Sequence, residues 1–305
     1  METANINFDF SSAQCLFCSA IGLVFVNKLR DDDKHWAAMC KSCDYVQLTP
    51  LPTAEEDEEY YQTNALFSVS NMDEEDLICK LNELSTFQYN IVKQLVPPPA
   101  DVIEIGSGYG LFLKKAMTDG YNVSGIEISA DKRAYCKKNT GLEIMNLNLI
   151  KDDISDELLN KYDIVTLFFS LEHIINPVDF LKRSSKLLKT NGKLIALVPN
   201  MNDFMMQLCA EYRDFQYFRP HISYFTSETL TKVFNNAGFH DINVFGKQQY
   251  SIENAIHWLR NKKPFLEYTQ IKMPRPELEF VNELYKAKLN DELKSDMLVA
   301  IGTKL

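Results

Sequence analysis

Short apolar runs alternate with amphipathic segments along most of the chain. Runs rich in Val, Ile and Phe between turn residues predict buried strands, whereas apolar positions three and four apart predict helices. The predicted strands cover residues 101–105, 122–128, 142–147, 162–170, 193–198 and 296–303. The predicted helices cover 73–96, 112–117, 130–139, a segment after Asn176-Pro177, one that begins near Ser227, 252–259 and 277–293. This order predicts an α/β fold, and the continuous apolar run 162–170 is typical of a central strand in a parallel sheet.

Three glycines, Gly106, Gly108 and Gly110, directly follow the predicted strand 101–105. Glycine permits backbone angles that other residues disfavour, and its lack of a Cβ lets a ligand approach the main chain closely. The next strand carries Glu127 about 20 residues after the first glycine, where doubly wound folds hold the two hydroxyls of a ribose. The pattern therefore predicts a ligand that contains a nucleoside.

The spacing of this turn differs from the dinucleotide fingerprint G-x-G-x-x-G, and Glu104 stands two residues before its first glycine. The turn resembles motif I of the class I S-adenosylmethionine-dependent methyltransferases. Three further segments are similar to that family in type and order: SLEHIINPVDFL, LLKTNGKLIALVPN and YFTSETLTKVFNNAGF. The resemblance implies a Rossmann-like sheet of seven strands with helices on both faces and an antiparallel last strand, 296–303. It also implies S-adenosylmethionine as cofactor, bound by Glu104, Gly106, Ser107, Gly108, Gly110, Glu127, Ile128, Leu171, Glu172 and His173.

The segment 217–226, YFRPHISYFT, lies between the last parallel strand and the following helix, so it must cross the mouth of the ligand crevice. His221 is the candidate general base, because imidazole titrates near neutral pH. Tyr224 is the second candidate catalytic residue. The alternative for His221 is a structural hydrogen bond that fixes the loop. His173 could act on the substrate, or it could be a hydrogen-bonded residue at a strand end.

Two C-x-x-C pairs near the N-terminus predict a structural zinc site with four thiolate ligands, Cys15, Cys18, Cys40 and Cys43. The intervening residues leave room for a β-hairpin through 22–26 and 36–39. A redox dithiol or unrelated buried cysteines are the alternatives. His35 is expected at the surface, since four sulfurs already complete the ligand set. The other cysteines, Cys79, Cys136 and Cys209, are expected to be small apolar residues of the core.

The formal net charge of −10 and the isoelectric point near 5.1 argue against a nucleic-acid partner, because such binding depends on phosphate neutralisation. Acidic runs at 31–33 and 55–59 surround the cysteine pairs. The N-terminus lacks the features of a secretion signal, and no apolar run has the length of a membrane span. We therefore expect a cytoplasmic protein without membrane contact. The sequence does not indicate an oligomeric state.

The chain divides into a zinc-ribbon-like segment, residues 1–60, a helical linker or lid, 61–99, and a catalytic domain, 100–305, with a helical insertion at 250–295. The stripe Ile252, Ala255, Ile256 and Leu259 in the insertion is expected to pack on the core. Tyr60 and Tyr61 either anchor the linker or touch a ligand. Tyr250 and Trp258 pack in the core or line a substrate pocket or a dimer contact.

The cysteine pairs, the methyltransferase-like core and the histidine before Y-F-T also resemble sugar C-methyltransferases that act on nucleotide-linked keto-sugars. The resemblance implies that His221 removes the proton beside a ketone. Two departures stand against it: the tyrosine and glutamate partners of that histidine are not matched, and 250–295 does not read as a second α/β domain. The leading hypothesis is methyl transfer to a small molecule such as a nucleotide-linked sugar. The alternatives are an RNA or protein methyltransferase docked by its ribbon, and a non-catalytic S-adenosylmethionine-binding protein.

Overall fold

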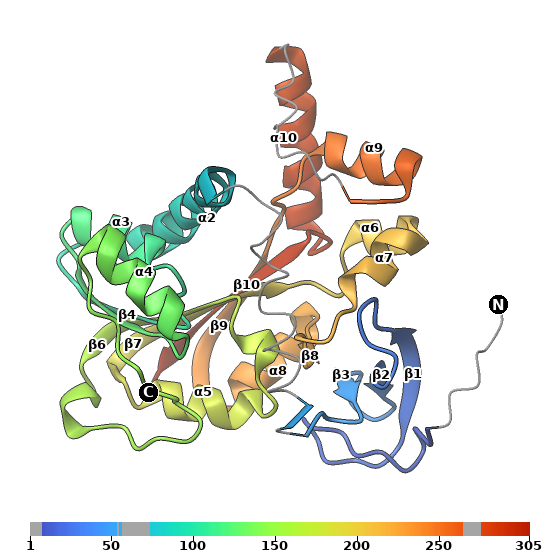
Figure 1. Ribbon diagram of the computed structural model, residues 1–305, viewed down its shortest axis with the longest axis horizontal. Coiled ribbons are helices and arrows are strands. Elements are labelled where there is room, and N and C mark those ends of the chain that lie inside the picture. The colour runs from blue at the N-terminus through green and yellow to red at the C-terminus, as the bar shows by residue number, and fades with distance from the viewer. Residues whose placement is uncertain (1–7, 54, 57–73, 265–275) are drawn as a thin grey trace.

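The computed structural model describes residues 8–53, 55–56, 74–264 and 276–305, with the side chains of 74–81 and 276–278 excepted. Two sheets organise this part of the chain (Figure 1). The strands of the larger sheet are β4 (Asp101–Ile105), β5 (Asn122–Ile126), β6 (Tyr162–Phe168), β7 (Leu188–Pro199), β9 (Phe239–Lys247) and β10 (Met297–Lys304). The strands of the smaller sheet are β1 (Leu23–Lys28), β2 (Trp36–Cys40), β3 (Val46–Thr49) and β8 (Ser223–Tyr224).

The larger sheet is Rossmann-like, with the strand order β5-β4-β6-β7-β10-β9. The four strands β5, β4, β6 and β7 are parallel, and β10 lies antiparallel between β7 and β9. The predicted α/β class and the antiparallel last strand are thus confirmed. Because the parallel strands end at the same edge of the sheet, the glycine turn after β4 and the residues after β6 and β7 come together there.

The predicted seventh strand, 142–147, is reduced to a single bridge between Ile126 and Met145, so the sheet has six strands in the described residues. Met145 still exchanges backbone hydrogen bonds with Gly125 and Glu127, at 2.9 and 3.1 Å. Beyond it, the Asn148 side chain accepts a hydrogen bond from the Ile150 amide. Such local side-chain bonds compete with a strand ladder, and they turn the chain away from the sheet edge.

Helices cover both faces of the larger sheet, as predicted. They are α2 (Glu74–Leu95), α3 (Leu111–Thr118), α4 (Ala130–Thr140), α5 (Pro177–Ser185), α6 (Phe204–Leu208), α7 (Ala210–Gln216), α8 (Ser227–Asn236), α9 (Ile252–Asn261) and α10 (Pro276–Asp291), with 3₁₀ turns η1 (Asp156–Leu158) and η2 (Leu171–His173). Successive strand residues point to opposite faces. Accordingly, Val102 and Ile164 pack with α2 and α3, whereas Ile103 and Val165 pack with α5 and α8.

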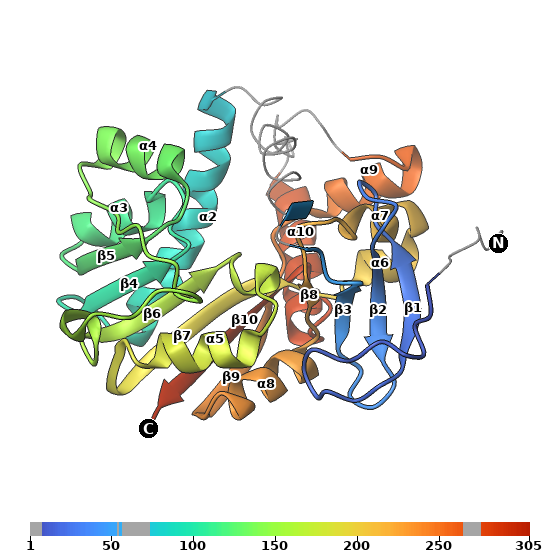
Figure 2. The same cartoon turned by 60° about the horizontal axis from the view of Figure 1, so that its bottom comes forward.

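The N-terminal hairpin forms as predicted from β1 and β2, and β3 continues the smaller sheet. Its fourth strand, β8, comes from residues more than 170 positions later and pairs Val46 with Tyr224 and Gln47 with Ser223. Figure 2 shows this sheet beside the larger one, with β8 next to β3. The division at residue 60 stays a prediction, and strand pairing crosses it.

His35 does not lie at the surface as predicted. Only 2% of it is exposed, and its Nδ1 lies 2.9 Å from the Asp32 carboxylate. One residue of the acidic run 31–33, the partly buried Asp32, is therefore the partner of the imidazole. Cys136 and Cys209 are fully buried, which confirms their expected place in the core. The side chain of Cys79 and residues Tyr60 and Tyr61 lie outside the described part.

The helices of the insertion form, but the predicted apolar stripe is only partly correct. Ala255 and Trp258 are the buried residues of α9, whereas Ile256 and Leu259 are 47% and 40% exposed. The Trp258 ring packs at right angles on Tyr212, with centroids 5.1 Å apart, so the indole replaces the aliphatic residues as the core contact. Helix α10 projects from the body of the molecule (Figure 1).

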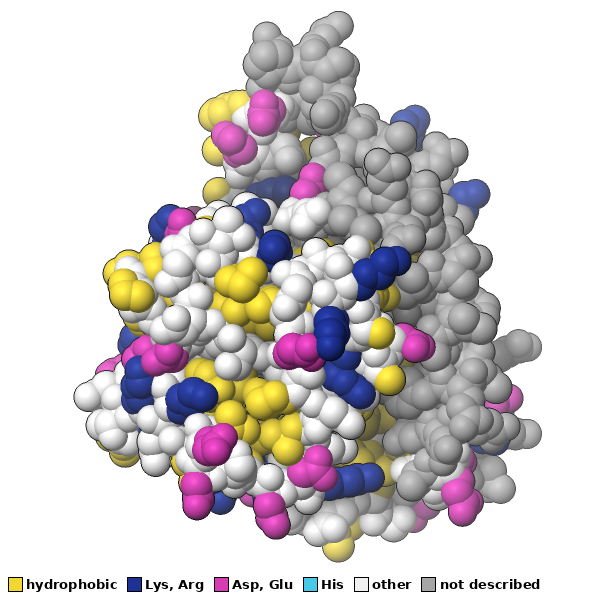
Figure 3. All heavy atoms as spheres, turned by 60° about the vertical axis from the view of Figure 1, so that its left-hand side comes forward, with side chains coloured by type: hydrophobic (Ala, Val, Ile, Leu, Met, Phe, Trp, Pro, Cys, Tyr) yellow, Lys and Arg dark blue, Asp and Glu magenta, His cyan; other side chains and the backbone are white. Residues whose placement is uncertain are grey.

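The face that carries α3 and α4 shows Lys and Arg side chains scattered among Asp and Glu (Figure 3). Among the described residues, no helix combines the length and the apolar character that a bilayer crossing demands.

Candidate active site

The glycine turn after β4 has the left-handed backbone that its sequence predicts. The φ angles of Gly106, Gly108 and Gly110 are 77°, 53° and 72°. A Cβ at Gly106 would collide with the Ser170 hydroxyl, and one at Gly110 with the Cys136 thiol. A Cβ at Gly108 would meet no atom of the described residues within 4 Å. Gly106 and Gly110 are therefore required for packing, and Gly108 borders the open space in which a ligand can approach the main chain.

Three acidic and polar side chains surround this open space. The Glu127 carboxylate accepts hydrogen bonds from the amides of Gly108, at 2.9 Å, and Ser129, at 2.8 Å. Glu104 is 4% exposed, and burial, reinforced by the nearby charge of Glu127, raises its pKa well above the usual value. Its Oε2 and the Ser107 hydroxyl have no hydrogen-bond partner among the described residues. A buried carboxyl without a partner next to an open glycine turn fits a ligand with a positive charge and hydroxyl groups.

We expect replacement of Gly108 by alanine to weaken binding of S-adenosylmethionine by tenfold or more, about 1.4 kcal/mol, because the methyl group fills the ligand's space. Gly141 provides a matched control, because it also has a positive φ, 77°, and open space around its Cβ, but it ends α4. The backbone strain of about 1–2 kcal/mol is then common to both variants. Calorimetric titration of each variant measures the difference. Equal losses of affinity would show that Gly108 does not border the ligand.

A second group of polar residues lies where β6 ends. Glu172 and His173 belong to η2, and His221 comes from the segment 217–225. One ligand atom from each lies within 4.8 Å of the other two, and the two imidazole rings are 5.3 Å apart between centroids. Ser170, two residues before Glu172, is the residue that touches Gly106. The cluster therefore adjoins the glycine turn.

Burial controls the charge of this cluster. It raises the pKa of Glu172, which is 1% exposed, to about 8. Burial, together with His173, lowers the pKa of His221 well below its usual value, and burial also lowers the pKa of His173. Both rings are therefore neutral near pH 7, and each has one nitrogen with a lone pair. The Glu172 Oε2 has no partner among the described residues.

The N-terminal sheet holds the segment 217–225 in place. The Tyr45 hydroxyl donates a hydrogen bond of 2.6 Å to Ser223, and the Leu48 amide donates one of 2.8 Å to the Ile222 carbonyl. The Arg30 guanidinium lies over the Phe218 ring, 4.5 Å from its centroid, and Phe218 in turn packs on His221 with centroids 4.0 Å apart. The ribbon and η2 thus both contact the segment, because the Ile222 amide also donates to the Glu172 carbonyl.

The other predicted site residues lie in different environments. The Tyr224 ring is 5% exposed, and its hydroxyl donates to the Phe218 carbonyl at 3.3 Å. Leu171 is fully buried in the core, whereas Ile128 is 65% exposed. Sequence reasoning missed Ser170, which contacts the glycine turn, although its position directly before the L-E-H segment was a usable signal.

A small pocket that His221 and Tyr224 line also contains polar residues that the sequence did not single out. These are Asn200, Asp203 and Asp296. Burial raises the pKa of Asp203 to about 6, and burial and Asp203 raise that of Asp296 to about 7. Asp203 accepts a hydrogen bond of 2.6 Å from the Tyr212 hydroxyl, so this carboxyl group also has a structural role.

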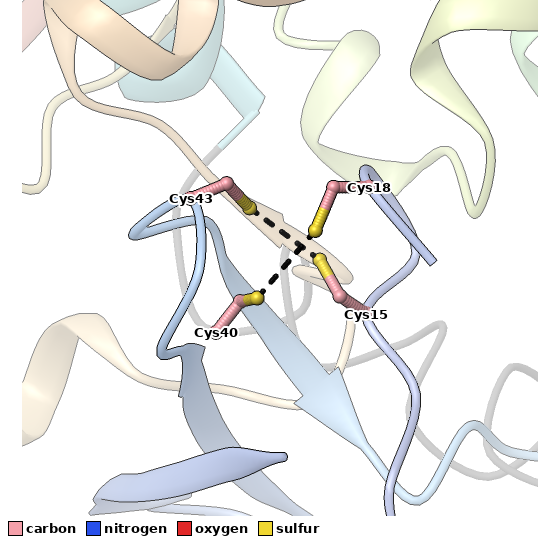
Figure 4. A group of neighbouring side chains, drawn as sticks. All are labelled: Cys15, Cys18, Cys40 and Cys43. Carbon is pink, nitrogen blue, oxygen red and sulfur yellow. Dashed lines mark hydrogen bonds between the residues drawn. The ribbon is translucent and has the colours of Figure 1, made fainter. Parts of the chain in front are cut away.

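The four predicted zinc ligands lie together at the end of the N-terminal hairpin (Figure 4). The Sγ atoms of Cys15 and Cys43 are 3.7 Å apart, and those of Cys18 and Cys40 are 3.6 Å apart. Sulfurs at 2.3 Å from a tetrahedral zinc ion are about 3.8 Å from one another. Backbone amides of Phe17 and Ser42 also point at two of the sulfurs. The geometry fits a zinc ion.

Comparison with known proteins gives one family. Residues 78–244, more than half of the chain, match a family model described as a methyltransferase domain. Among curated proteins, the ubiquinone biosynthesis O-methyltransferase of Coxiella burnetii is 29% identical over 116 residues, which cover 37% of this chain and 49% of that protein. The corresponding enzyme of Dechloromonas aromatica is 26% identical over 33% of this chain and 45% of its own length. The chain thus spans about half the length of the curated relatives that it matches.

One solved structure supports this fold, and a second is reported for comparison. A chain from the complex of the Haloferax volcanii Trm112 methyltransferase activator with a methyltransferase has a TM-score of 0.50 and 15% identity, over 76% of this chain and 94% of its own. An S-adenosylmethionine-dependent methyltransferase from Archaeoglobus fulgidus has a TM-score of 0.48 and 18% identity, over 72% and 94%.

Proposed function

The chain belongs to the methyltransferase-domain family, and on this premise we propose that it transfers the methyl group of S-adenosylmethionine to a small molecule. The open glycine turn carries the proposal, because Gly108 borders free space at the edge of the sheet where Rossmann-like folds bind nucleosides. The cofactor supplies an activated methyl group on a sulfonium. The protein then has mainly to hold, align and dehydrate the two reactants.

The residues around the turn suit this ligand. Each Glu127 oxygen accepts one amide hydrogen bond, so each keeps a lone pair for a ribose hydroxyl. Glu104 supplies a buried carboxyl for the positively charged amino-acid end, and the Ser107 hydroxyl supplies a further hydrogen bond. Binding of a cation would favour the ionised form of Glu104.

We assign the acceptor to the side of the cofactor where Glu172, His173 and His221 meet. His221 is the proposed proton acceptor, since its ring is neutral and lies in the pocket beside η2. Tyr224 shapes the pocket with its ring, because burial keeps its hydroxyl protonated and the Phe218 carbonyl accepts its hydrogen bond.

The acceptor atom is proposed to be a hydroxyl oxygen. The curated relatives named above are O-methyltransferases, and the lining of the pocket by Asn200, Asp203 and Asp296 supports a polar acceptor. The nucleotide-linked sugar predicted from the sequence depends only on the resemblance of the ribbon and of 217–226. A nucleotide-linked sugar is therefore one of the candidate acceptors to be tested.

Incubation with methyl-labelled S-adenosylmethionine tests the proposal. The acceptors are hydroxylated aromatic compounds, nucleotide-linked hydroxy- and keto-sugars, an RNA pool and a protein lysate. We expect one methyl group to be added to a hydroxyl of one small-molecule class. Transfer to RNA or protein alone would contradict the proposed substrate class, and absence of cofactor binding would contradict methyl transfer itself.

We further propose that Cys15, Cys18, Cys40 and Cys43 hold a zinc ion with a structural role. Four thiolates complete a tetrahedral shell and leave no position for a substrate. The ion would join the two C-x-x-C pairs and thereby fix β3, which pairs with β8 in the segment 217–225.

A further inference from the structure

We propose that Glu172, His173 and His221 form a second metal site, which binds a divalent cation at the acceptor end of the active site. Two imidazoles and one carboxylate are a common ligand set for catalytic metals, in which open positions remain for water or substrate. One ligand atom of each residue already lies within 4.8 Å of the other two. A cation about 2.1 Å from each atom requires separations of about 3.0–3.5 Å between the ligand atoms, so the side chains need to close by no more than about 1.5 Å on binding.

Glu172 gives the strongest reason to expect a ligand here. It is 1% exposed, and its Oε2 has no hydrogen-bond partner among the described residues. A buried carboxyl oxygen without a partner is costly unless something binds to it. A cation satisfies the carboxylate and both imidazoles together.

His173 has the orientation that a metal-binding histidine needs. Its Nδ1 lies 2.8 Å from the Pro220 carbonyl oxygen, which can only accept, so Nδ1 carries the proton. The lone pair of the neutral ring is therefore on Nε2. A hydrogen bond from the other ring nitrogen to a backbone carbonyl is the usual support of a histidine ligand. Pro220 directly precedes His221, so the same loop positions both rings.

This site differs in chemistry from the cysteine cluster. Thiolates favour soft or borderline ions in a closed tetrahedral shell, whereas nitrogen and oxygen ligands with open positions suit Zn²⁺, Fe²⁺ or Co²⁺ in exchange with solvent. The two sites should therefore differ in affinity and in their rates of metal exchange. Measurements can load the cysteine site first and then examine the second.

The consequence for methyl transfer rests on the proposed function. A cation at this site binds the acceptor hydroxyl and lowers its pKa, so that the proton passes to solvent water. As the new O–C bond forms, the S–C bond of the cofactor breaks, and S-adenosylhomocysteine leaves with the electron pair on sulfur. His221 then acts as a ligand, and the cation takes over the activation otherwise assigned to the imidazole base.

Titration of zinc-loaded protein with Co²⁺, followed by calorimetry, tests the site without reference to activity. We expect one further Co²⁺ per chain, and we expect Glu172→Gln to weaken this binding by about 100-fold or more, since loss of outer-shell partners alone costs 10–100-fold. Glu253→Gln is the matched control, because Glu253 also has a buried oxygen without a partner but belongs to no such histidine cluster in the described residues. It should bind Co²⁺ as the unmodified protein does.

His173→Ala provides a second variant in case Glu172→Gln alters folding, which thermal unfolding reports. It too should lose the additional Co²⁺ and keep the ribbon zinc. A titration that detects no metal beyond the ribbon zinc would overturn the second site while leaving methyl transfer intact. Equal Co²⁺ binding by the Glu172→Gln and Glu253→Gln proteins would overturn it as well. Loss of cofactor binding in the unmodified protein would instead contradict the proposed function.

Discussion

Replacement of His221 by alanine is expected to lower kcat by about 10²–10⁴-fold, the usual contribution of a group that activates the reacting atom. The dissociation constant of S-adenosylmethionine should change little, because His221 lines the pocket with Asp203 and Asp296, and it is not among the residues that a Cβ on the glycine turn would meet. Steady-state kinetics and calorimetry measure the two quantities separately. The expected result is a loss confined to turnover.

Two variants give this experiment its controls. His240→Ala makes the same chemical change at the start of β9, beside Asp241 and at the opposite edge of the sheet from the site. It should leave turnover unaffected. Tyr224→Phe removes only a hydroxyl that bonds to the Phe218 carbonyl, so turnover should fall by severalfold at most. Near-normal turnover of the His221→Ala enzyme would exclude the residue both as a base and as a ligand of a required cation.

Loss of one cysteine ligand should have the second large effect, and this effect should extend to the segment 217–225, which carries His221. Metal binding in small thiolate sites contributes about 10–16 kcal/mol to folding. Loss of even about 5 kcal/mol lowers Tm by roughly 10–20 °C in a domain of this size. Cys40 is fully buried at the end of β2, so Cys40→Ser removes both a ligand and a core contact. We expect this variant to lose zinc, stability and turnover.

Cys209→Ala separates these causes. Cys209 is equally buried but lies outside the cluster, and its replacement should cost only about 1 kcal/mol, as removal of a small core group does. Metal analysis and thermal unfolding of both variants test the expectation. A Cys40→Ser protein with an unchanged Tm, or an unmodified protein purified without chelator and found free of zinc, would contradict the structural role of the metal.

Elements with a strong hydrophobic period could be predicted from the sequence. The runs that became β4, β6 and α8 have clear apolar spacing and end at glycine, proline or capping residues, so local physics determines their type. The same holds for the two C-x-x-C pairs. Within each pair only two residues separate the cysteines, so a local turn is enough to bring their sulfur atoms close together. Met145 shows the limit, since an apolar segment before Asn148 was expected to form a full strand and makes one bridge.

Contacts between distant segments could not be predicted. The two residues of β8 have no strand pattern of their own and are extended only because β3 offers them a partner. Glu172 and His221 are 49 positions apart, and only the fold brings them together. His35 was misjudged for a different reason, since its partner is the Asp32 carboxylate only three residues before it. For β8 and for the Glu172–His221 pair, by contrast, the deciding interaction is absent from the local sequence.

The pairing of β3 with β8 limits where this protein can be truncated or divided into separate domains. Excision of residues 1–60 would leave Ser223 and Tyr224 as an unpaired sheet edge and would uncover the Phe225 ring, which packs on Tyr45. The remaining chain should then aggregate instead of behaving as a smaller enzyme. Exchange of the ribbon for one from another protein would succeed only if the donor brought a matching edge and an aromatic residue at the place of Tyr45. A graft intended to change acceptor specificity would therefore have to transfer the N-terminal sheet together with the segment that contains β8.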